Sequence, residues 1–105
     1  MLRVMLGPDA IAERVISHLR EEGFIDYPFT RADLDSEIER WCEKARVKLG
    51  SLQRIRETVA ALPGVKRTRL RLNSFDPRHQ YIRRRLRASG QDGDYPTVYF
   101  ITCVD

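Results

Sequence analysis

The segment DPRHQYIRRRLRASG, residues 76–90, carries the densest charge in the chain, with a single acid, Asp76. Guanidinium groups suit phosphate binding, because each presents several N–H donors to the oxygens of one anion. At about 100° per helical residue, Arg83 and Arg87 share one face, Arg84 lies next to it and Arg85 lies elsewhere. This pattern predicts a helix that is basic nearly all round and contacts DNA phosphates rather than bases. The candidate backbone contacts here are Arg78, Arg83, Arg84 and Arg87.

A second row of arginines lies in VKRTRLRL, residues 65–72. The alternation of side chains predicts a half-buried strand with Arg67, Arg69 and Arg71 on its solvent face. Such a row, spaced by about 7 Å, can follow a phosphate backbone. The alternative interpretation is an edge strand whose charges prevent aggregation.

A third candidate is a helix over residues 51–62, with Ser51 as its N-cap and apolar residues every three or four positions. Its first turns carry side chains suited to base edges, since Arg pairs with guanine and Gln with adenine. The candidate base-contacting residues are Ser51, Gln53, Arg54 and Arg56. The alternative is an ordinary solvated helix face.

Catalysis and metal binding find little support in the sequence. There is no glycine-rich phosphate loop, no nucleophile motif and no metal-ligand spacing. His79, between Arg78 and Tyr81, could serve acid–base cleavage of RNA, but a single histidine in a basic cluster does not define such a site. We therefore expect no enzyme, no cofactor and no metal.

The net charge of +4 is unevenly distributed. Residues 1–50 carry 8 basic and 10 acidic side chains, whereas residues 51–105 carry 11 and 5. This asymmetry favours a polyanionic partner, most simply nucleic acid. The competing explanation is internal pairing of the arginines with an acidic helix around residues 33–43, through Asp33, Asp35, Glu37 and Glu39.

The length and patterning predict a single domain over residues 1–105. Helices are expected from Asp9 to Gly23 and over residues 31–49, where Thr30 and Asp33 form a capping box and Gly50 ends the helix. A very short Gly50-Ser51 junction would then connect to the helix over 51–62. Residues 97–104, TVYFITCV, predict a central strand. No apolar run approaches the length of a membrane span, and the N-terminus lacks the features of a secretion signal, so an intracellular, cytoplasmic protein is expected.

The order of three helices, a strand, an insertion and a strand resembles the winged helix-turn-helix family. The resemblance covers TRADLDSEIERWCEKARVKLGSLQRIRETVAALPGV, KRTRLRL and TVYFITCV. It implies an α+β fold with a three-helix core, a small antiparallel sheet and a basic helical insertion in the wing, longer than a typical wing. It also implies that the helix over 51–62 enters the major groove of double-stranded DNA. Many such proteins bind two half-sites as homodimers.

Two alternatives remain. ALPGVKRTRLRL also looks like one half of a ferredoxin-like α/β sandwich, with residues 2–6 as a third strand. Such a domain would be a protein-binding accessory or inhibitor protein of phage or virus type, with the acidic helix over 33–43 as its contact face. The first hypothesis is a small basic DNA-binding regulator of transcription or replication, such as a viral or mobile element encodes.

Overall fold

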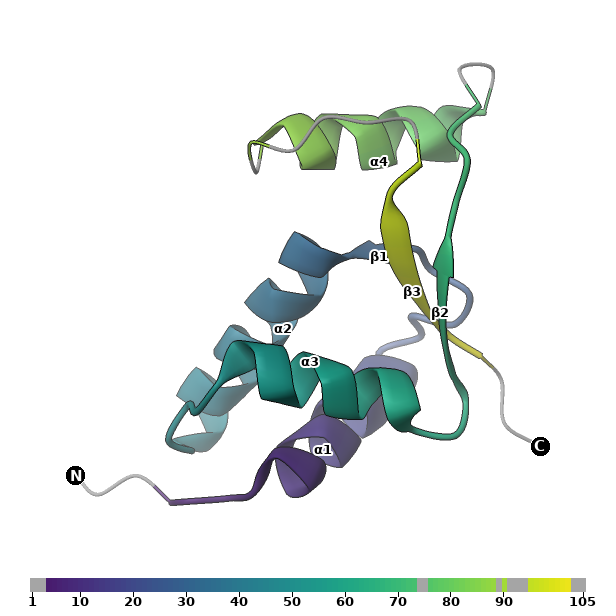
Figure 1. Cartoon of the computed structure of the whole chain (residues 1–105). Coiled ribbons are helices and arrows are strands. Elements are labelled where there is room, and N and C mark those ends of the chain that lie inside the picture. Colours follow the sequence, from purple (N-terminus) through teal and green to yellow (C-terminus); the bar gives the residue numbers. More distant parts are fainter. Residues whose placement is uncertain (1–3, 74–75, 89, 91–94, 103–105) are drawn as a thin grey trace.

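The computed structural model describes residues 4–73, 76–88, 90 and 95–102 of the chain. Helices surround one end of a small antiparallel sheet, which is the α+β class expected from the sequence (Figure 1). In chain order the elements are α1 (Pro8–Glu21), β1 (Phe29–Thr30), α2 (Arg31–Ala45), α3 (Leu52–Ala61), β2 (Val65–Arg69), α4 (Pro77–Ala88) and β3 (Thr97–Ile101).

The main core lies between α1, α2, α3 and the sheet, because the apolar stripe of each helix faces the other two. Its members are fully buried aliphatic side chains at helical spacing, such as Val15 of α1, Ile38 of α2 and Val59 of α3. Ile101 and Tyr99 of β3 extend this core to the sheet. Of the described helices, none is long and apolar enough to cross a membrane.

Local capping confirms two of the expected helix starts. Thr30 and Asp33 form the reciprocal capping box, with distances of 3.1 and 3.3 Å between side-chain oxygens and backbone nitrogens. The Oγ atom of Ser51 accepts a hydrogen bond from the backbone N–H of Arg54, as an N-cap does. The first helix begins at Pro8, one residue before the expected start at Asp9.

The end of α2 corrects the expectation of a helix over 31–49. The helix ends at Ala45, and Arg46 adopts a left-handed conformation with φ 55°. Val47 is then buried and pairs with Val4 in an isolated parallel bridge. Burial of Val47 thus requires the chain to leave the helix, and residues 46–51, rather than a Gly-Ser junction, connect α2 to α3.

The sheet has the strand order β1-β3-β2, with both pairings antiparallel. The central position of β3 confirms the expectation for residues 97–104, although the strand ends at Ile101 and residues 103–105 lie outside the described part. The third strand is Phe29–Thr30. The alternative sheet with residues 2–6 as a strand is therefore wrong for the described residues, among which Val4 pairs only with Val47.

The helix α4 lies across the far end of the sheet, apart from α1 and α3 (Figure 1). Its start is capped, since the carboxylate of Asp76 accepts the backbone N–H of Arg78 at 2.9 Å. Ile82 and Leu86 form a second, smaller core with Leu72, against which Leu70 packs. The two ends of the molecule therefore have separate apolar cores.

Candidate nucleic-acid interface

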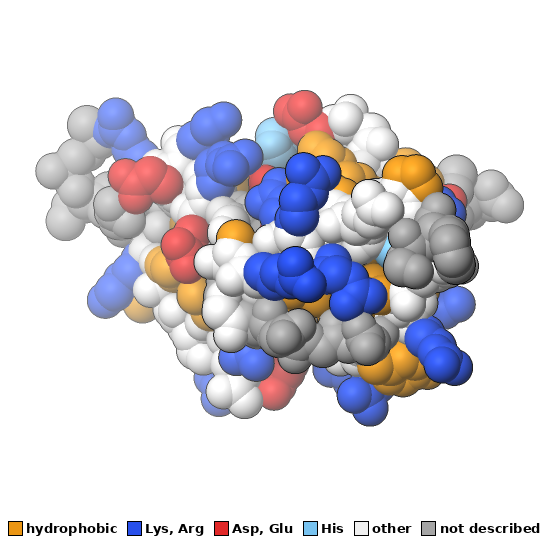
Figure 2. All heavy atoms as spheres, turned by 90° about the horizontal axis from the view of Figure 1, so that it is seen from above, with side chains coloured by type: hydrophobic (Ala, Val, Ile, Leu, Met, Phe, Trp, Pro, Cys, Tyr) orange, Lys and Arg blue, Asp and Glu red, His pale blue; other side chains and the backbone are white. Residues whose placement is uncertain are grey.

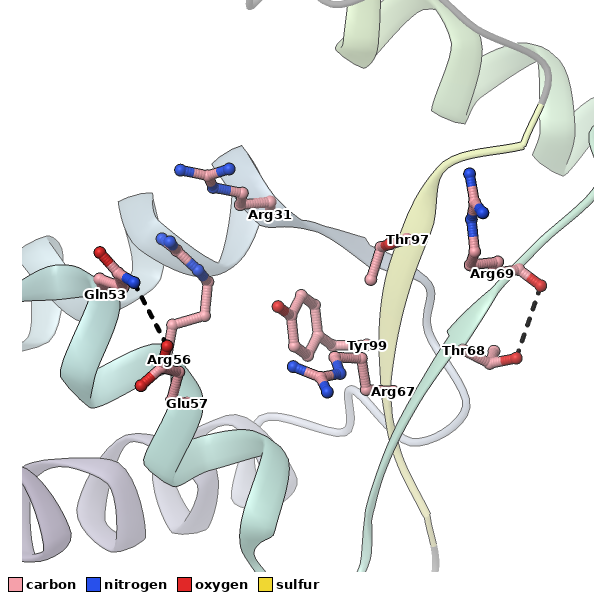
Figure 3. Close-up of a pocket in the computed structure, with 9 residues that line it drawn as sticks. All are labelled: Arg31, Gln53, Arg56, Glu57, Arg67, Thr68, Arg69, Thr97 and Tyr99. Carbon is pink, nitrogen blue, oxygen red and sulfur yellow. Dashed lines mark hydrogen bonds between the residues drawn. The ribbon is translucent and has the colours of Figure 1, made fainter.

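A cleft of about 670 Å³ separates α3 from the upper part of the sheet. Figure 3 shows its side chains, which come from α2, α3, β2 and β3. The lining residues are Arg31, Gln53, Arg56, Glu57, Arg67, Thr68, Arg69, Thr97 and Tyr99. Four of these nine are arginines and one is an acid, so the cleft is a basic site.

The sheet wall of the cleft follows from the pairing of β2 with β3. Arg67 lies opposite Tyr99 and Arg69 opposite Thr97, and directly opposed residues project from the same face of a sheet. At the other end of this face, Ile101 is buried in the main core. The sheet face therefore packs against helices at one end and lines the cleft at the other.

The predicted exposure of the arginine row is confirmed, because Arg67, Arg69 and Arg71 are all exposed. Among the described residues, Arg67 and Arg71 form no ion pair. Arg69 stacks on Tyr95, with its guanidinium carbon 4.9 Å from the ring centroid. Such stacking leaves the charge of the guanidinium intact.

Arg56 is a correction to the predicted set of base contacts. The residue is buried, with 8% of its surface exposed. Its Nη1 atom donates to both carboxylate oxygens of Asp35, at 2.6 and 2.7 Å. Arg56 therefore joins α3 to α2, and a base contact would require breaking this half-buried ion pair.

The other predicted residues of α3 lie at the surface. Gln53 is exposed, and its Nε2 atom donates to the Oε1 atom of Glu57, one turn later, at 3.3 Å. Arg54 is exposed and lies outside the cleft. Ser51 is exposed beside them and caps the helix. The cleft thus brings together Gln53 with the strand arginines, whereas Arg54 belongs to the neighbouring surface.

The arginines of α4 divide into engaged and exposed groups. Arg78 pairs with Asp76 at 3.2 Å, and Arg83 is half-buried and interacts with other parts of the chain. Arg84 and Arg87 are exposed and form no ion pair with any described residue. In the view onto the α4 side, basic side chains outnumber acidic ones (Figure 2). This end of the molecule therefore presents a second basic surface.

Arg85 tethers α4 to the start of α2. Its Nη1 atom lies 3.2 Å from the Oδ1 atom of Asp33, and its Nε and Nη2 atoms donate to the hydroxyl of Tyr81 at 2.9 and 2.7 Å. The Tyr81 hydroxyl also accepts the hydroxyl of Tyr27 at 3.0 Å. The competing explanation, internal pairing with the acidic segment 33–43, is thus real for Arg85, and Arg56 pairs with this segment as well.

These contacts shift three pKa values. Burial, followed by the hydrogen bond to Tyr81, raises the pKa of Tyr27 to about 12. The hydrogen bonds from Tyr27 and then from Arg85 lower the pKa of Tyr81, because they favour its phenolate. The Tyr81 hydrogen bond, with the nearby Asp33 carboxylate, raises the pKa of Arg85, so its charge persists over the whole physiological range.

His79 has a structural position. Its Nδ1 atom accepts the backbone N–H of Asn73 at 2.7 Å, and its Nε2 atom lies 3.8 Å from an oxygen of Asp76. The ring therefore closes the turn before α4. Within the described ranges, no group of three or more His, Cys, Asp or Glu side chains could hold a metal ion.

The sequence did not reveal the other residues of the cleft. Arg31, Tyr99 and Thr97 join it only through the register of β3 and the packing of the start of α2 beside it. No local pattern distinguishes them from other exposed or core residues. Glu57 could have been found, since it lies one helical turn after Gln53 on the same face.

Comparisons of the chain with protein-family models, with curated proteins and with solved structures found no match. The function is therefore argued from the geometry and charge of this chain alone.

Proposed function

We propose that this protein binds double-stranded DNA and regulates transcription or replication. In this proposal the exposed side of α3 faces the major groove, and the basic surfaces of β2 and α4 contact phosphates. The observation that carries it is the set of exposed arginines without an ion-pair partner among the described residues: Arg54, Arg67, Arg71, Arg84 and Arg87. Cations exposed in this way are available to replace the counterions of DNA.

The element order supports a winged-helix interpretation. A helix and the short strand β1 precede α2 and α3, and β2 and β3 then flank the segment that contains α4. In such an arrangement α3 would be the recognition helix and α4 would stand in the place of the wing. Arg54, with Gln53 and Ser51, is exposed at the N-terminal part of α3, where recognition helices contact bases.

The alternative of a protein-binding accessory factor receives less support. Its predicted contact face was the acidic helix over 33–43, and two of its acids are engaged inside the molecule. Asp33 pairs with Arg85 and Asp35 with Arg56. The acidic charge available to a partner is correspondingly smaller.

The test is fluorescence anisotropy of a labelled mixed-sequence duplex at several salt concentrations, with unlabelled single strand as competitor. We expect duplex binding that weakens with salt, with a slope of log K against log salt of about −0.9 per neutralised phosphate. The change Arg84→Gln should weaken binding to all sequences and reduce the slope by about 1.

On a selected site, Arg54→Ala should cost about 1–3 kcal/mol and relax the preference for that site. Arg14→Gln is the matched control for charge, because Arg14 is exposed on α1, at the opposite end of the molecule from α4 (Figure 1). Equal losses for Arg14→Gln and Arg84→Gln, or no binding at low salt, would reject the proposal.

A further inference from the structure

The cleft between α3 and β2 is polarised from one wall to the other. Arg67 and Arg69 lie on the sheet wall, and the Gln53–Glu57 pair lies along α3 on the opposite wall (Figure 3). A nucleotide has the same polarity, with an anionic phosphate at one end and a neutral base edge with hydrogen-bonding groups at the other. Charge and hydrogen-bonding groups in the cleft thus match one nucleotide unit.

The sheet wall has the groups that bind a phosphate. Arg67 forms no ion pair with a described residue, and Arg69 keeps its charge while it stacks on Tyr95. Thr97 adds a hydroxyl on the same face of the sheet, opposite Arg69. Guanidinium groups and hydroxyls together are the usual donors to phosphate oxygens.

Tyr99 provides an independent observation at the floor of the cleft. Only 6% of the residue is exposed, yet it lines the cleft, and its hydroxyl points toward α3 (Figure 3). This hydroxyl forms no hydrogen bond with any residue that the structure describes. A tyrosine hydroxyl can both donate and accept a hydrogen bond, so both capacities are available to a ligand in the cleft.

The helix wall selects against phosphate and in favour of an amino group. Glu57 is the one carboxylate among the described residues that line the cleft, and it is held beside Gln53 by their hydrogen bond. A carboxylate repels phosphate but accepts a hydrogen bond from an exocyclic amino group, as Glu does from cytosine N4. Thymine has no such amino group.

The volume and the two walls of the cleft suit a single unpaired base. About 670 Å³ lies within the range of clefts that hold small ligands. A stacked and paired base is enclosed by its duplex, so it cannot contact two walls of a protein cleft unless it leaves the stack.

We propose that the cleft between α3 and β2 binds a single unpaired nucleotide, with its phosphate at Arg67 and Arg69 and an amino-bearing base edge at Glu57. The proposal rests on the proposed function for the nucleic-acid class of the ligand. It adds a site that duplex binding by α4 does not require. The nucleotide could be free or part of an unpaired strand, and the shared chemistry is the phosphate with its base.

The experiment is a titration of the ¹⁵N-labelled full chain, followed by amide chemical shifts, with four probes: deoxycytidine 5′-monophosphate, thymidine 5′-monophosphate, deoxycytidine and inorganic phosphate. We expect shifts at β2, β3 and the first turns of α3, with the cytidine nucleotide tightest. A short single strand of cytidines is titrated next. Binding per site that is tighter than that of the mononucleotide identifies an unpaired strand as the ligand, and equal binding identifies the free nucleotide.

Two cleft variants separate the two halves of the site. Arg67→Gln should weaken the cytidine nucleotide about 10-fold, as expected for loss of a hydrogen-bonded charge. Glu57→Gln should abolish the preference for cytidine over thymidine nucleotide and strengthen binding of inorganic phosphate. Arg14→Gln is the matched control, because it removes the same charge from α1, outside the cleft, and should leave nucleotide binding unchanged.

Three results would overturn the inference: no shifts at the cleft with any probe, inorganic phosphate binding as tightly as the nucleotide, or equal losses for Arg67→Gln and Arg14→Gln. Arg67 is exposed, so its variant should fold, and the amide spectrum itself verifies this. Duplex binding without nucleotide binding would overturn this inference and leave the proposed function in place. Nucleotide binding without duplex binding would overturn the proposed function and leave this inference in place.

Discussion

The helices α3 and α4 each carry an arginine that pairs with an acid near the start of α2, and the two pairs differ in burial. The side chains of Arg56 and Asp35 are 10% and 21% exposed, whereas Arg85 is 50% exposed against 11% for Asp33. The helix α3 also shares the main core, while α4 packs over a small cluster around Ile82.

The difference shows how one residue type takes two structural roles. A buried ion pair is expensive to break, because the remaining partner stays out of water without compensation. An exposed pair gains little, since water and salt screen it. We therefore expect α3 to be fixed rigidly to α2, and α4 to be held mainly by its apolar face, with Arg85 as a weak tether.

Arg56→Ala should produce the largest effect, a loss of about 3 kcal/mol in the free energy of unfolding. The physical reason is that Asp35, in a half-buried position, loses its only ion-pair partner among the described residues. Urea denaturation measures this loss in the free energy of unfolding. As the control, Arg54→Ala removes an exposed arginine from the same helix and should change that free energy by less than about 0.5 kcal/mol.

The double change Arg56→Met with Asp35→Leu should recover most of this loss, because apolar residues of similar volume replace a buried pair at little cost. Equal stability of the Arg56→Ala and Arg54→Ala variants would show that the Arg56–Asp35 pair is not expensive to break, in spite of its burial.

Arg85→Ala should produce a smaller effect, about 0.5 kcal/mol, because half of the side chain is in solvent. Its distinguishing signature is local: amide hydrogen exchange should accelerate in α4 and remain unchanged in α3. Arg84→Ala serves as the control, since Arg84 is exposed on the same helix without an ion pair to a described residue. Uniform acceleration across both helices would contradict the weak-tether interpretation.

The smallest effect concerns the tyrosine pair beneath Arg85. With the pKa of Tyr27 raised to about 12, the folded state holds a proton that the unfolded chain loses near pH 10. Stability should therefore decrease as the pH rises from about 10 to 12. The lowered pKa of Tyr81 acts in the opposite sense and reduces the net change.

Absorbance of the phenolate, compared between the native chain and the Tyr27→Phe variant, measures the ionisation of Tyr27. Tyr81→Phe removes the acceptor and should lower the pKa of Tyr27, although burial keeps it above the ordinary value. Ionisation of Tyr27 near pH 10 in the native chain would show that the pair does not form in solution.

Local sequence patterns determined much of the fold. The caps at Thr30 and Ser51, the alternation of β2 and the apolar spacing of α4 all depend on residues within one or two turns of each other. The end of α2 was missed because Val47 leaves the helix to enter the core and pair with Val4, which is distant in sequence.

Which arginines remain available was decided only by the tertiary structure. Arg54 and Arg56 look equivalent in the sequence, but only Arg56 reaches Asp35, 21 residues earlier. The cleft depends in the same way on the β2–β3 register, which places Tyr99 beside Arg67. The sequence by itself determined where charge is concentrated and which segments are helices, since these follow from local spacing. Ion pairing and enclosure require groups far apart in the chain to meet, so they exist only once the chain is folded.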